Sequence, residues 1–348
     1  YLKSERIYKL GKPETYLFFT EISLQLTSKE GLVGLIIPNA WLTNYYGKQI
    51  REFVLEKAKV QQVVNLEPIG VFQEAVVDTV VIILQRQDDL TSRMEHMIEV
   101  CEGESPGQLT QPFLIPQRFW MQDDEYLFNI MASAEEIAIM QKMEQVGVTL
   151  DELGEYSQGI IPYKTRADAE NDPHFSNVKT SNEWKPALES SNSVHRYSVT
   201  WEGRYLHYGK WLWCARESKY FERPKILFHR LRKKLPRQLV GAFDDQGLYN
   251  RHSLSNYILH PESTHNLKFV LTIFNSKLAN YWFVKKFGLL MEVGGFKILQ
   301  LPIRRIDFTT PAAERAALVE QAIALYEAAL ADTHYAVRTT PLLAFTAD

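Results

Sequence analysis

The sequence predicts an α/β layered fold in its first part and an irregular α+β unit in its second. Three observations lead to this class. Amphipathic helices alternate with short apolar runs over residues 12–87, a polar and turn-rich stretch follows, and short strand-like runs separated by Gly, Pro and Asn begin near residue 194. The length of 348 residues also favours two domains over one core.

The first part contains the clearest element pattern. A helix is expected over 12–27, because a proline can occupy its first position and apolar residues recur at helical spacing. The runs 32–37 and 79–84 are nearly continuous apolar stretches, which is typical of strands buried on both faces, as in a parallel sheet. Between them the pattern predicts a helix after Gly47 and a strand over 60–66.

The composition of the sequence changes after residue 87. Polar, turn-rich residues follow 87, a helix is expected over 133–145, and a long polar loop over 168–193. A final helix over 311–331 would bury a stripe made of Leu318, Ala322, Leu325 and Ala329. We therefore expect four segments: 1–87 as the first domain, 88–150 as a connecting region, 151–310 as the second domain, and 311–348 as a helix with its tail.

Composition sets limits on the class of protein. With 45% hydrophobic and 23% charged residues, the chain is neither disordered nor collagenous. The two cysteines, Cys101 and Cys214, exclude a disulfide scaffold and a four-cysteine zinc site. No apolar run approaches the ~20 residues of a membrane span. We expect a cytoplasmic protein without a membrane partner, and the non-Met start at Tyr1 suggests a piece of a longer chain.

Positive charge is concentrated between Arg204 and Val240. Eleven lysines and arginines stand there against two acids, a net charge of +9, with aromatic residues interleaved. This mixture is suited to phosphate neutralisation beside base or sugar contacts, although a solvated basic face over core aromatics is the competing interpretation. The candidate DNA-binding residues, with one more downstream, are Arg204, Lys210, Arg216, Lys225, Arg230, Arg232, Lys233, Lys234, Arg237 and Lys297.

Two separated blocks resemble TaqI-like DNA adenine methyltransferases. The first block is Gly31-Leu32-Val33-Gly34-Leu35-Ile36-Ile37-Pro38-Asn39-Ala40-Trp41-Leu42, with Gly47-Lys48, Arg51 and then Val71-Phe72-Gln73-Glu74-Ala75-Val76-Val77-Asp78-Thr79. The second includes Gly203-Arg204-Tyr205-Leu206-His207-Tyr208-Gly209, Arg223-Pro224-Lys225, Phe274-Asn275-Ser276-Lys277 and Gly294-Gly295-Phe296-Lys297. The resemblance implies that 1–87 is the C-terminal part of a Rossmann-like methyltransferase sheet. It implies that 151–310 is a DNA target recognition (specificity) domain.

The departures from the family limit what this chain does alone. The catalytic signature, Asn or Asp followed by Pro-Pro-Tyr or Pro-Pro-Phe, is absent, and so is the glycine-rich turn that holds S-adenosylmethionine. In the family both precede the position of Tyr1. We therefore expect no activity, cofactor or metal in this chain. The parent would be an S-adenosylmethionine-dependent, site-specific DNA adenine methyltransferase of a restriction-modification or phage-defence system, with or without a fused endonuclease.

The resemblance also assigns Phe72 to the pocket for the flipped base, since a methylated adenine must leave the duplex and stack on an aromatic face. A core phenylalanine is the competing interpretation. The expected partners are double-stranded DNA and the missing N-terminal part of the methyltransferase. The alternative function is a stand-alone nucleic-acid-binding or protein-interaction module without a methyltransferase partner. The acid-x-lysine triplets 183–185 and 217–219 are too short to favour a nuclease.

Overall fold

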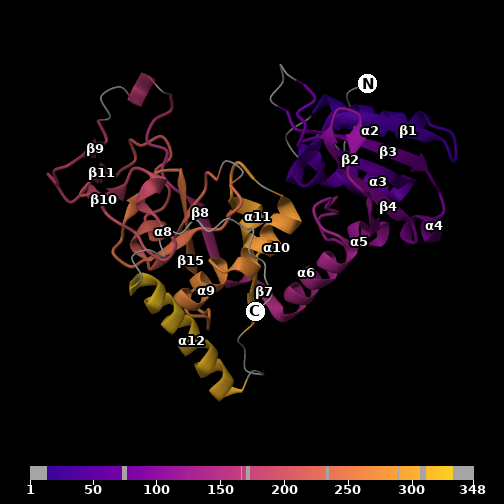
Figure 1. Cartoon of the computed structure of the whole chain (residues 1–348). Coiled ribbons are helices and arrows are strands. Elements are labelled where there is room, and N and C mark those ends of the chain that lie inside the picture. The colour runs from indigo at the N-terminus through magenta and orange to yellow at the C-terminus, as the bar shows by residue number, and fades with distance from the viewer. Residues whose placement is uncertain are drawn as a thin grey trace. The chain divides into compact units, whose positions relative to one another are not determined.

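The computed structural model describes residues 14–72, 77–165, 167–169, 173–232, 235–288, 290–305 and 311–331. The chain forms two compact units, residues 1–139 and 140–348, which run from indigo to magenta and from magenta to yellow in Figure 1. The boundary falls inside helix α6 (Ala134–Val146). Both units combine helices with β-sheets, which confirms the mixed α/β class expected from the sequence.

A six-stranded sheet forms the core of the first unit. Its strands are β1 (Leu32–Pro38), β2 (Ala58–Asn65), β3 (Thr79–Arg86), β4 (Met97–Ser105), β5 (Gln108–Leu109) and β6 (Phe113–Pro116). The order is β1-β3-β2-β4-β5, with β6 paired to β4. Strands β2 and β4 run parallel, and the other described pairs of this sheet are antiparallel. The three strands expected in the first part of the sequence are therefore present.

The expectation that β1 is buried on both faces in a parallel arrangement is wrong. Strand β1 pairs antiparallel with β3. Its side chains point alternately to the two faces of the sheet, and Val33 and Ile37 lie on the buried face. Leu32 and Ile36, on the opposite face, are 64% and 49% exposed. An apolar run predicts a strand but not its neighbours, since pairing depends on segments distant in the sequence.

Helices α2 (Thr15–Leu26) and α3 (Lys48–Lys57) pack beside β1 and β2, and Arg51 of α3 is fully buried. Burial lowers the pKa of Arg51 to about 10. Gly47 leaves room for its guanidinium, because a Cβ at Gly47 would lie 2.6 Å from Nη1. The guanidinium donates hydrogen bonds of 2.5–2.9 Å to the carbonyls of Trp41, Asn44, Glu125 and Tyr126. One side chain thus joins the turns after β1 to a turn about 75 residues later.

Short elements complete the first unit. They are the 3₁₀ turns η1 (Asn39–Leu42) and η2 (Tyr45–Gly47) and the helices α4 (Leu90–Met94) and α5 (Gln117–Met121). The buried Gln117 amide accepts from Val60 N at 2.8 Å and donates to Ala58 O at 2.9 Å, where β2 carries a bulge. This side chain therefore takes hydrogen bonds that the irregular ladder leaves open.

Small sheets build the second unit. Its strands are β7 (Gly147–Thr149), β8 (Gly154–Gln158), β9 (Phe175–Ser176), β10 (Trp184–Leu188), β11 (Tyr205–His207), β12 (Lys225–His229), β13 (Gly241–Asp244), β14 (Tyr249–Asn250), β15 (Leu254–Leu259) and β16 (Pro302–Arg304). Their orders are β14-β10-β11-β9, β13-β12-β15-β8 and β16-β7. The helices and turns are α7 (Leu150–Leu153), η3 (Ala167–Ala169), η4 (Ser191–Ser193), α8 (Lys219–Glu222), α9 (Leu267–Phe274), α10 (Lys277–Phe287), α11 (Gly295–Leu299) and α12 (Ala312–Ala331).

The break between α9 and α10 anchors both helices to the sheet. The buried Asn275 side chain accepts from Gly241 N at 2.9 Å and donates to Gly241 O at 2.8 Å. Ser276 caps α10 by accepting from Ala279 N at 3.0 Å. One turn later, Asn280 Oδ1 accepts from the backbone of Gln238 and Leu239. The motif residues Asn275 and Ser276 therefore have a structural function.

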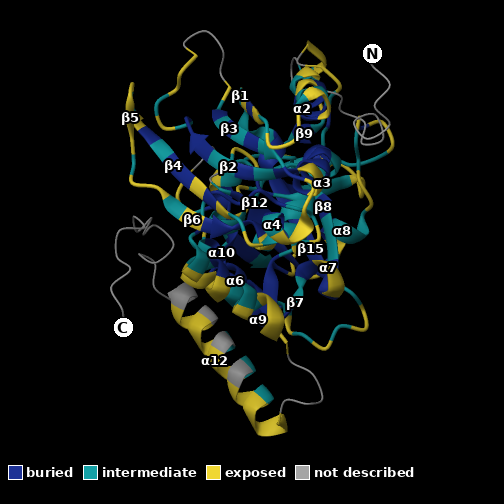
Figure 2. Cartoon of the chain, turned by 90° about the vertical axis from the view of Figure 1, so that its right-hand side faces the viewer, coloured by how far each residue is buried: buried dark blue, intermediate teal, exposed yellow. Residues whose placement is uncertain are grey.

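Helix α12 confirms the helix expected over 311–331, and it lies beside α9. Most of its described surface is exposed (Figure 2). Leu325 was expected in a buried stripe, but its side chain is 63% exposed. The side chains of Leu318, Ala322 and Ala329 lie outside the described residues. Among the described helices, none is both long and apolar enough to cross a membrane.

Candidate nucleic-acid interface

One face of the sheet β14-β10-β11-β9 carries aromatic side chains. Trp184 of β10 lies directly opposite His207 of β11, and their rings stack with centroids 4.9 Å apart and planes 12° apart. Leu206 and Ala187 occupy the other face, where they are buried in an apolar cluster. Because successive strand residues point to opposite faces, the register that buries Leu206 turns Trp184 and His207 outward.

Trp211 extends this arrangement. Its ring centroid lies 4.3 Å from that of His207, and its Nε1 donates to His207 O at 3.0 Å. Gly209 makes the approach possible, since a Cβ there would lie 2.3–2.5 Å from the Trp211 ring. Trp211 is 47% exposed. We refer to Trp184, His207 and Trp211 as the ring stack.

The aromatic residues of the basic segment divide between two environments. Phe221 is buried in the apolar cluster, and Tyr208 packs against it. Trp211 and Trp213 are 47% and 54% exposed, and Lys164 lies with its Nζ 4.9 Å from the Trp213 ring. The interpretation of these aromatics as core residues therefore holds for some of them only.

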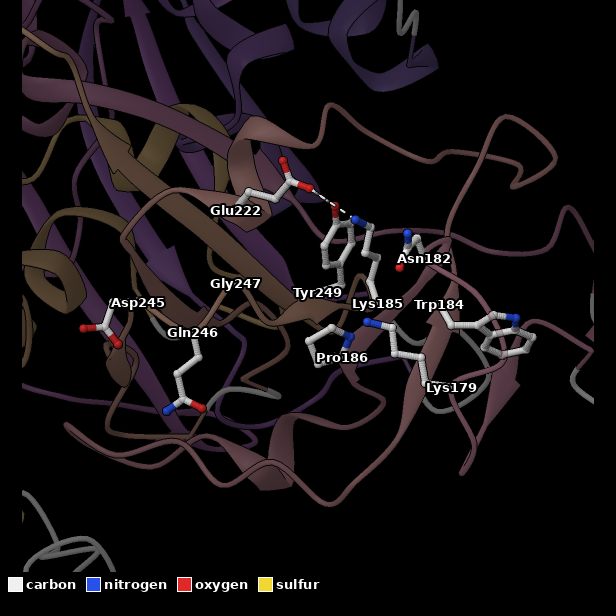
Figure 3. Close-up of a pocket in the computed structure, with 10 residues that line it drawn as sticks. All are labelled: Lys179, Asn182, Trp184, Lys185, Pro186, Glu222, Asp245, Gln246, Gly247 and Tyr249. Atoms are coloured by element: carbon white, nitrogen blue, oxygen red, sulfur yellow. Dashed lines mark hydrogen bonds and ion pairs between the residues drawn. The ribbon is translucent and has the colours of Figure 1, made fainter.

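An open groove of about 580 Å³ begins at Trp184 (Figure 3). Within it, Lys185 Nζ lies 3.7 Å from Glu222 Oε1, and the Tyr249 hydroxyl donates to the same carboxylate at 2.9 Å. Other residues that contribute to its lining are Lys179, Asn182, Asp245 and Gln246. The groove thus combines amides, cations and carboxylates, and Trp184 lies at one end of it with the indole directed away from the other labelled side chains (Figure 3).

Three of the candidate cations lie in residues 204–216, the segment that also carries His207 and Trp211. Lys210 and Arg216 are exposed. Arg216 has a positive φ of 62°, and its carbonyl accepts a hydrogen bond from the Tyr208 hydroxyl at 2.7 Å. Arg204 donates to Asn177 Oδ1 and to Glu189 Oε1, each at 2.8 Å. Lys210 and Arg216 are thus the more accessible of the three.

The assignment of Lys225 to the DNA surface is wrong. Its side chain is fully buried, forms an ion pair with the equally buried Asp244, and donates to Phe221 O at 2.5 Å. Burial lowers the pKa of Lys225, and the Asp244 carboxylate opposes this shift. A charge count along the sequence includes this lysine because the count carries no information on burial.

Arg232 is also misassigned to the DNA surface, since it is 9% exposed and donates through Nε and Nη2 to Arg237 O. Arg230 forms an ion pair of 2.5 Å with Glu292, and Arg237 donates to Asn275 O at 3.1 Å. These arginines bind parts of the second unit to one another.

The remaining candidate cations are three lysines. Lys233 and Lys234 lie outside the described residues, and Lys297 has its Nζ 5.5 Å from the Phe287 ring.

His229 is held in its neutral form beside these arginines. Its Nε2 lies 2.6 Å from Val194 O, and its Nδ1 lies 3.2 Å from Arg232 Nη1. The carbonyl requires a proton on Nε2, and the arginine requires an acceptor at Nδ1. Burial lowers the pKa of His229 to about 4.

Phe72 follows β2 in the first unit and is 48% exposed. This exposure argues against the interpretation of Phe72 as a core residue. Its assignment to the pocket for the flipped base stays a prediction. Residues 73–76 of the same motif lie outside the described residues. In the described part of the chain, no group of His, Cys, Asp and Glu residues is arranged to hold a metal ion.

Sequence reasoning missed Trp184 and the groove. Trp184 precedes the charged segment by twenty residues, and its register with His207 brings the two together. The available signal was that His207 follows the apolar Leu206 in a strand-like run, which places His207 on the face opposite to Leu206. The partner strand could not be identified from that pattern.

Comparisons with known families agree with the motifs. Residues 185–303 match the TaqI-like C-terminal specificity domain, and residues 1–72 match the Eco57I restriction-modification methylase family. The resemblance inferred from the sequence is therefore confirmed. The matched part of the second unit is thus similar to the TaqI-like specificity domain, and the matched part of the first is similar to a restriction-modification methylase.

Individual relatives point to the same class. A Methanocaldococcus jannaschii protein named as a type II restriction enzyme and methyltransferase is 22% identical over 306 residues, which cover 83% of this chain and 24% of that protein. The type II methyltransferase M.BstVI of Geobacillus stearothermophilus is 32% identical over 65 residues, 19% of this chain and 12% of that one. This chain thus spans a quarter or less of these relatives.

A solved structure shares the fold. The type IIL restriction-modification enzyme MmeI in complex with DNA superposes with a TM-score of 0.50 at 10% sequence identity, covering 92% of this chain and 44% of that chain. At this identity the likeness concerns the fold alone.

Replacing Lys225 tests its structural function. Lys225→Met should lower the free energy of unfolding by about 3–5 kcal/mol, because Asp244 stays behind as an uncompensated buried charge. Urea denaturation of the variant and of Lys210→Met, an exposed control expected within about 0.5 kcal/mol of the wild type, measures this. A stable Lys225→Met variant with weakened DNA binding would contradict the burial.

His229 should make stability depend on pH. Its pKa is about 4 in the folded chain and near 6.5 when unfolded, so the unfolded state binds the proton more tightly between these values. Stability contributed by the neutral ring is complete above pH 6.5 and is lost as the pH falls toward 4. In urea titrations at pH 7 and pH 5, wild type should lose more stability than His229→Gln. Equal losses would contradict the assignment.

Proposed function

We propose that the second unit recognises a DNA sequence on behalf of an adenine-N6 DNA methyltransferase of a restriction-modification or phage-defence system. The observation that carries this is the specificity-domain match over 185–303, the segment that holds His207, the exposed Trp211 and the exposed cations Lys210 and Arg216. Exposed aromatic side chains in a segment that also carries Lys210 and Arg216 are suited to DNA, because cations neutralise phosphates and rings contact bases or sugars.

We further propose that the first unit completes a Rossmann-like methyltransferase sheet begun by an upstream part. Two features support this. Among the described residues β1 pairs on one side only, with β3, and β3 lies between β1 and β2. Leu32 and Ile36 expose apolar surface beside that open edge, which further strands and helices would cover.

S-adenosylmethionine belongs, in this proposal, to the upstream part of the parent protein. The residues of this chain do not fit the cofactor. The turn after β1 is occupied by the Arg51 guanidinium, which binds the carbonyls of Trp41 and Asn44. The sequence holds neither a glycine-rich strand-to-helix turn nor the acid that binds ribose hydroxyls. The chain alone is therefore proposed to be inactive in methyl transfer.

DNA binding should depend on salt with a slope that reflects the accessible cations. Lys164, Lys179, Lys210 and Arg216 can each neutralise one phosphate, so the logarithm of affinity should fall against the logarithm of salt concentration with a slope of about −3.6. Fluorescence anisotropy with a duplex measures this. Lys210→Ala combined with Arg216→Ala should reduce the slope by about 1.8, and Lys29→Ala, in the first unit, should leave it unchanged. A slope near zero would exclude phosphate contacts.

Phe72 is proposed to stack on the flipped adenine. In a protein that joins this chain to the upstream part, Phe72→Ala should slow methylation roughly ten- to a hundred-fold, since stacking contributes ~1–3 kcal/mol per base. Its melting temperature should stay unchanged, because the side chain is 48% exposed. The neighbouring Val71→Ala is the matched control and should methylate normally. An unchanged methylation rate in Phe72→Ala would exclude Phe72 from the base pocket.

A further inference from the structure

We infer that residues 244–248, which connect β13 to β14, read the edge of a DNA base through the side chain of Gln246. We call this segment the 244–248 turn. The inference rests on the proposed function and adds to it a specificity-determining residue. The turn lies within 185–303, which matches the specificity domain, and it joins two sheets, since β13 pairs with β12 and β14 pairs with β10. Asp245 and Gln246 are exposed there.

A buried ion pair holds the first end of the turn. Lys225 of β12 lies directly opposite Asp244 of β13 in the strand register, and both side chains are fully buried. The Asp244 carboxylate also accepts from Gln246 N at 3.0 Å and from Leu248 N at 3.1 Å. Replacing a buried ion pair by apolar residues is often neutral or stabilising, so stability alone does not account for this pair. Its carboxylate fixes the backbone of the turn, and Lys225 is therefore a positioning residue.

Packing and one hydrogen bond hold the second end. Leu248 is buried in an apolar cluster, and Tyr249 is buried with its hydroxyl donating to Glu222 Oε1 at 2.9 Å. Gly247 has a φ of 72°, which lets the chain turn between Gln246 and Leu248 without a side-chain clash. Because both ends are fixed, the turn has little conformational freedom left to lose when it meets DNA.

The Gln246 side chain has the chemistry to read adenine. It extends from the turn away from Glu222 (Figure 3), and among the described residues its amide has no hydrogen-bond partner. The amide offers a donor and an acceptor, which match the N7 acceptor and the N6 donor of adenine in the major groove. The exposed Asp245 carboxylate next to it repels a phosphate, so a base edge is the better ligand.

The test uses the full chain and a library of duplexes with a randomised central segment. Bound duplexes are selected and sequenced, and competition anisotropy then measures the affinities of the selected duplex and its single-base variants. Wild type should select a DNA motif that contains adenine. Gln246→Ala should lower the discrimination for adenine at one position by roughly 5- to 150-fold, as expected for the loss of one bidentate contact, and leave the other positions unchanged. Gln246→Glu, an acceptor only, should prefer cytosine there, since cytosine presents an amine.

Two pairs of variants separate base reading from general effects. Gln321→Ala removes an exposed glutamine from α12 and should select the same motif as wild type. Gly247→Ala keeps the Gln246 side chain but strains the turn, so it should weaken discrimination at the position that Gln246→Ala affects. Gly107→Ala places a similar strain in the first unit, at a φ of 83°, and should leave the motif unchanged.

The outcomes distinguish the inference from the proposed function. The same motif in wild type and Gln246→Ala overturns the base contact and leaves the proposed function standing, and so does a wild-type motif without adenine. An equal loss of affinity for all duplexes in Gln246→Ala also overturns the base contact, because it indicates a contact to phosphate or sugar. A wild type that selects no motif overturns both.

Discussion

The second unit depends on one constraint, namely that buried backbone polar groups must find hydrogen-bond partners where regular strands are short. Side chains supply many of these partners. Lys225 reaches Phe221 O, and Asn275 bonds both backbone groups of Gly241. Asn280 serves two successive amides after Pro236. An unpaired buried group costs about 1–3 kcal/mol, so these contacts determine which loops can be buried at all. Some charged and amide residues of the specificity motifs, such as Lys225 and Asn275, therefore stabilise the fold of the second unit. Others, such as Lys210, are exposed and can contact a ligand.

Close backbone approach is the second determinant, and glycines provide it at two informative places. Gly47 admits the Arg51 guanidinium that joins distant turns of the first unit, and Gly209 admits the Trp211 ring that completes the ring stack. At both places a methyl group would overlap the neighbouring side chain. The motif glycines thus act through the space that they leave.

The sequence predicted the elements better than their pairing. The runs at β1, β2 and β3 are strands as expected, because apolar periodicity is a local property. Their antiparallel pairing, and the register that sets Trp184 against His207, depend on contacts between distant segments. The charge count located the basic segment but could not separate buried Lys225 from exposed Lys210, because burial follows from packing. The family motifs supplied what local patterns could not, namely the class of protein.

Among the residues that the structure describes, the edge of β1 away from β3 has no strand partner, and this has a consequence for handling the chain in isolation. An unpaired strand edge is a template for the same strand of another molecule, and Leu32 and Ile36 place apolar side chains beside it. Colloidal behaviour would then be governed by a short segment of the first unit, whatever the stability of the second. Protein concentration, rather than temperature alone, becomes the variable that determines whether the isolated chain stays dispersed.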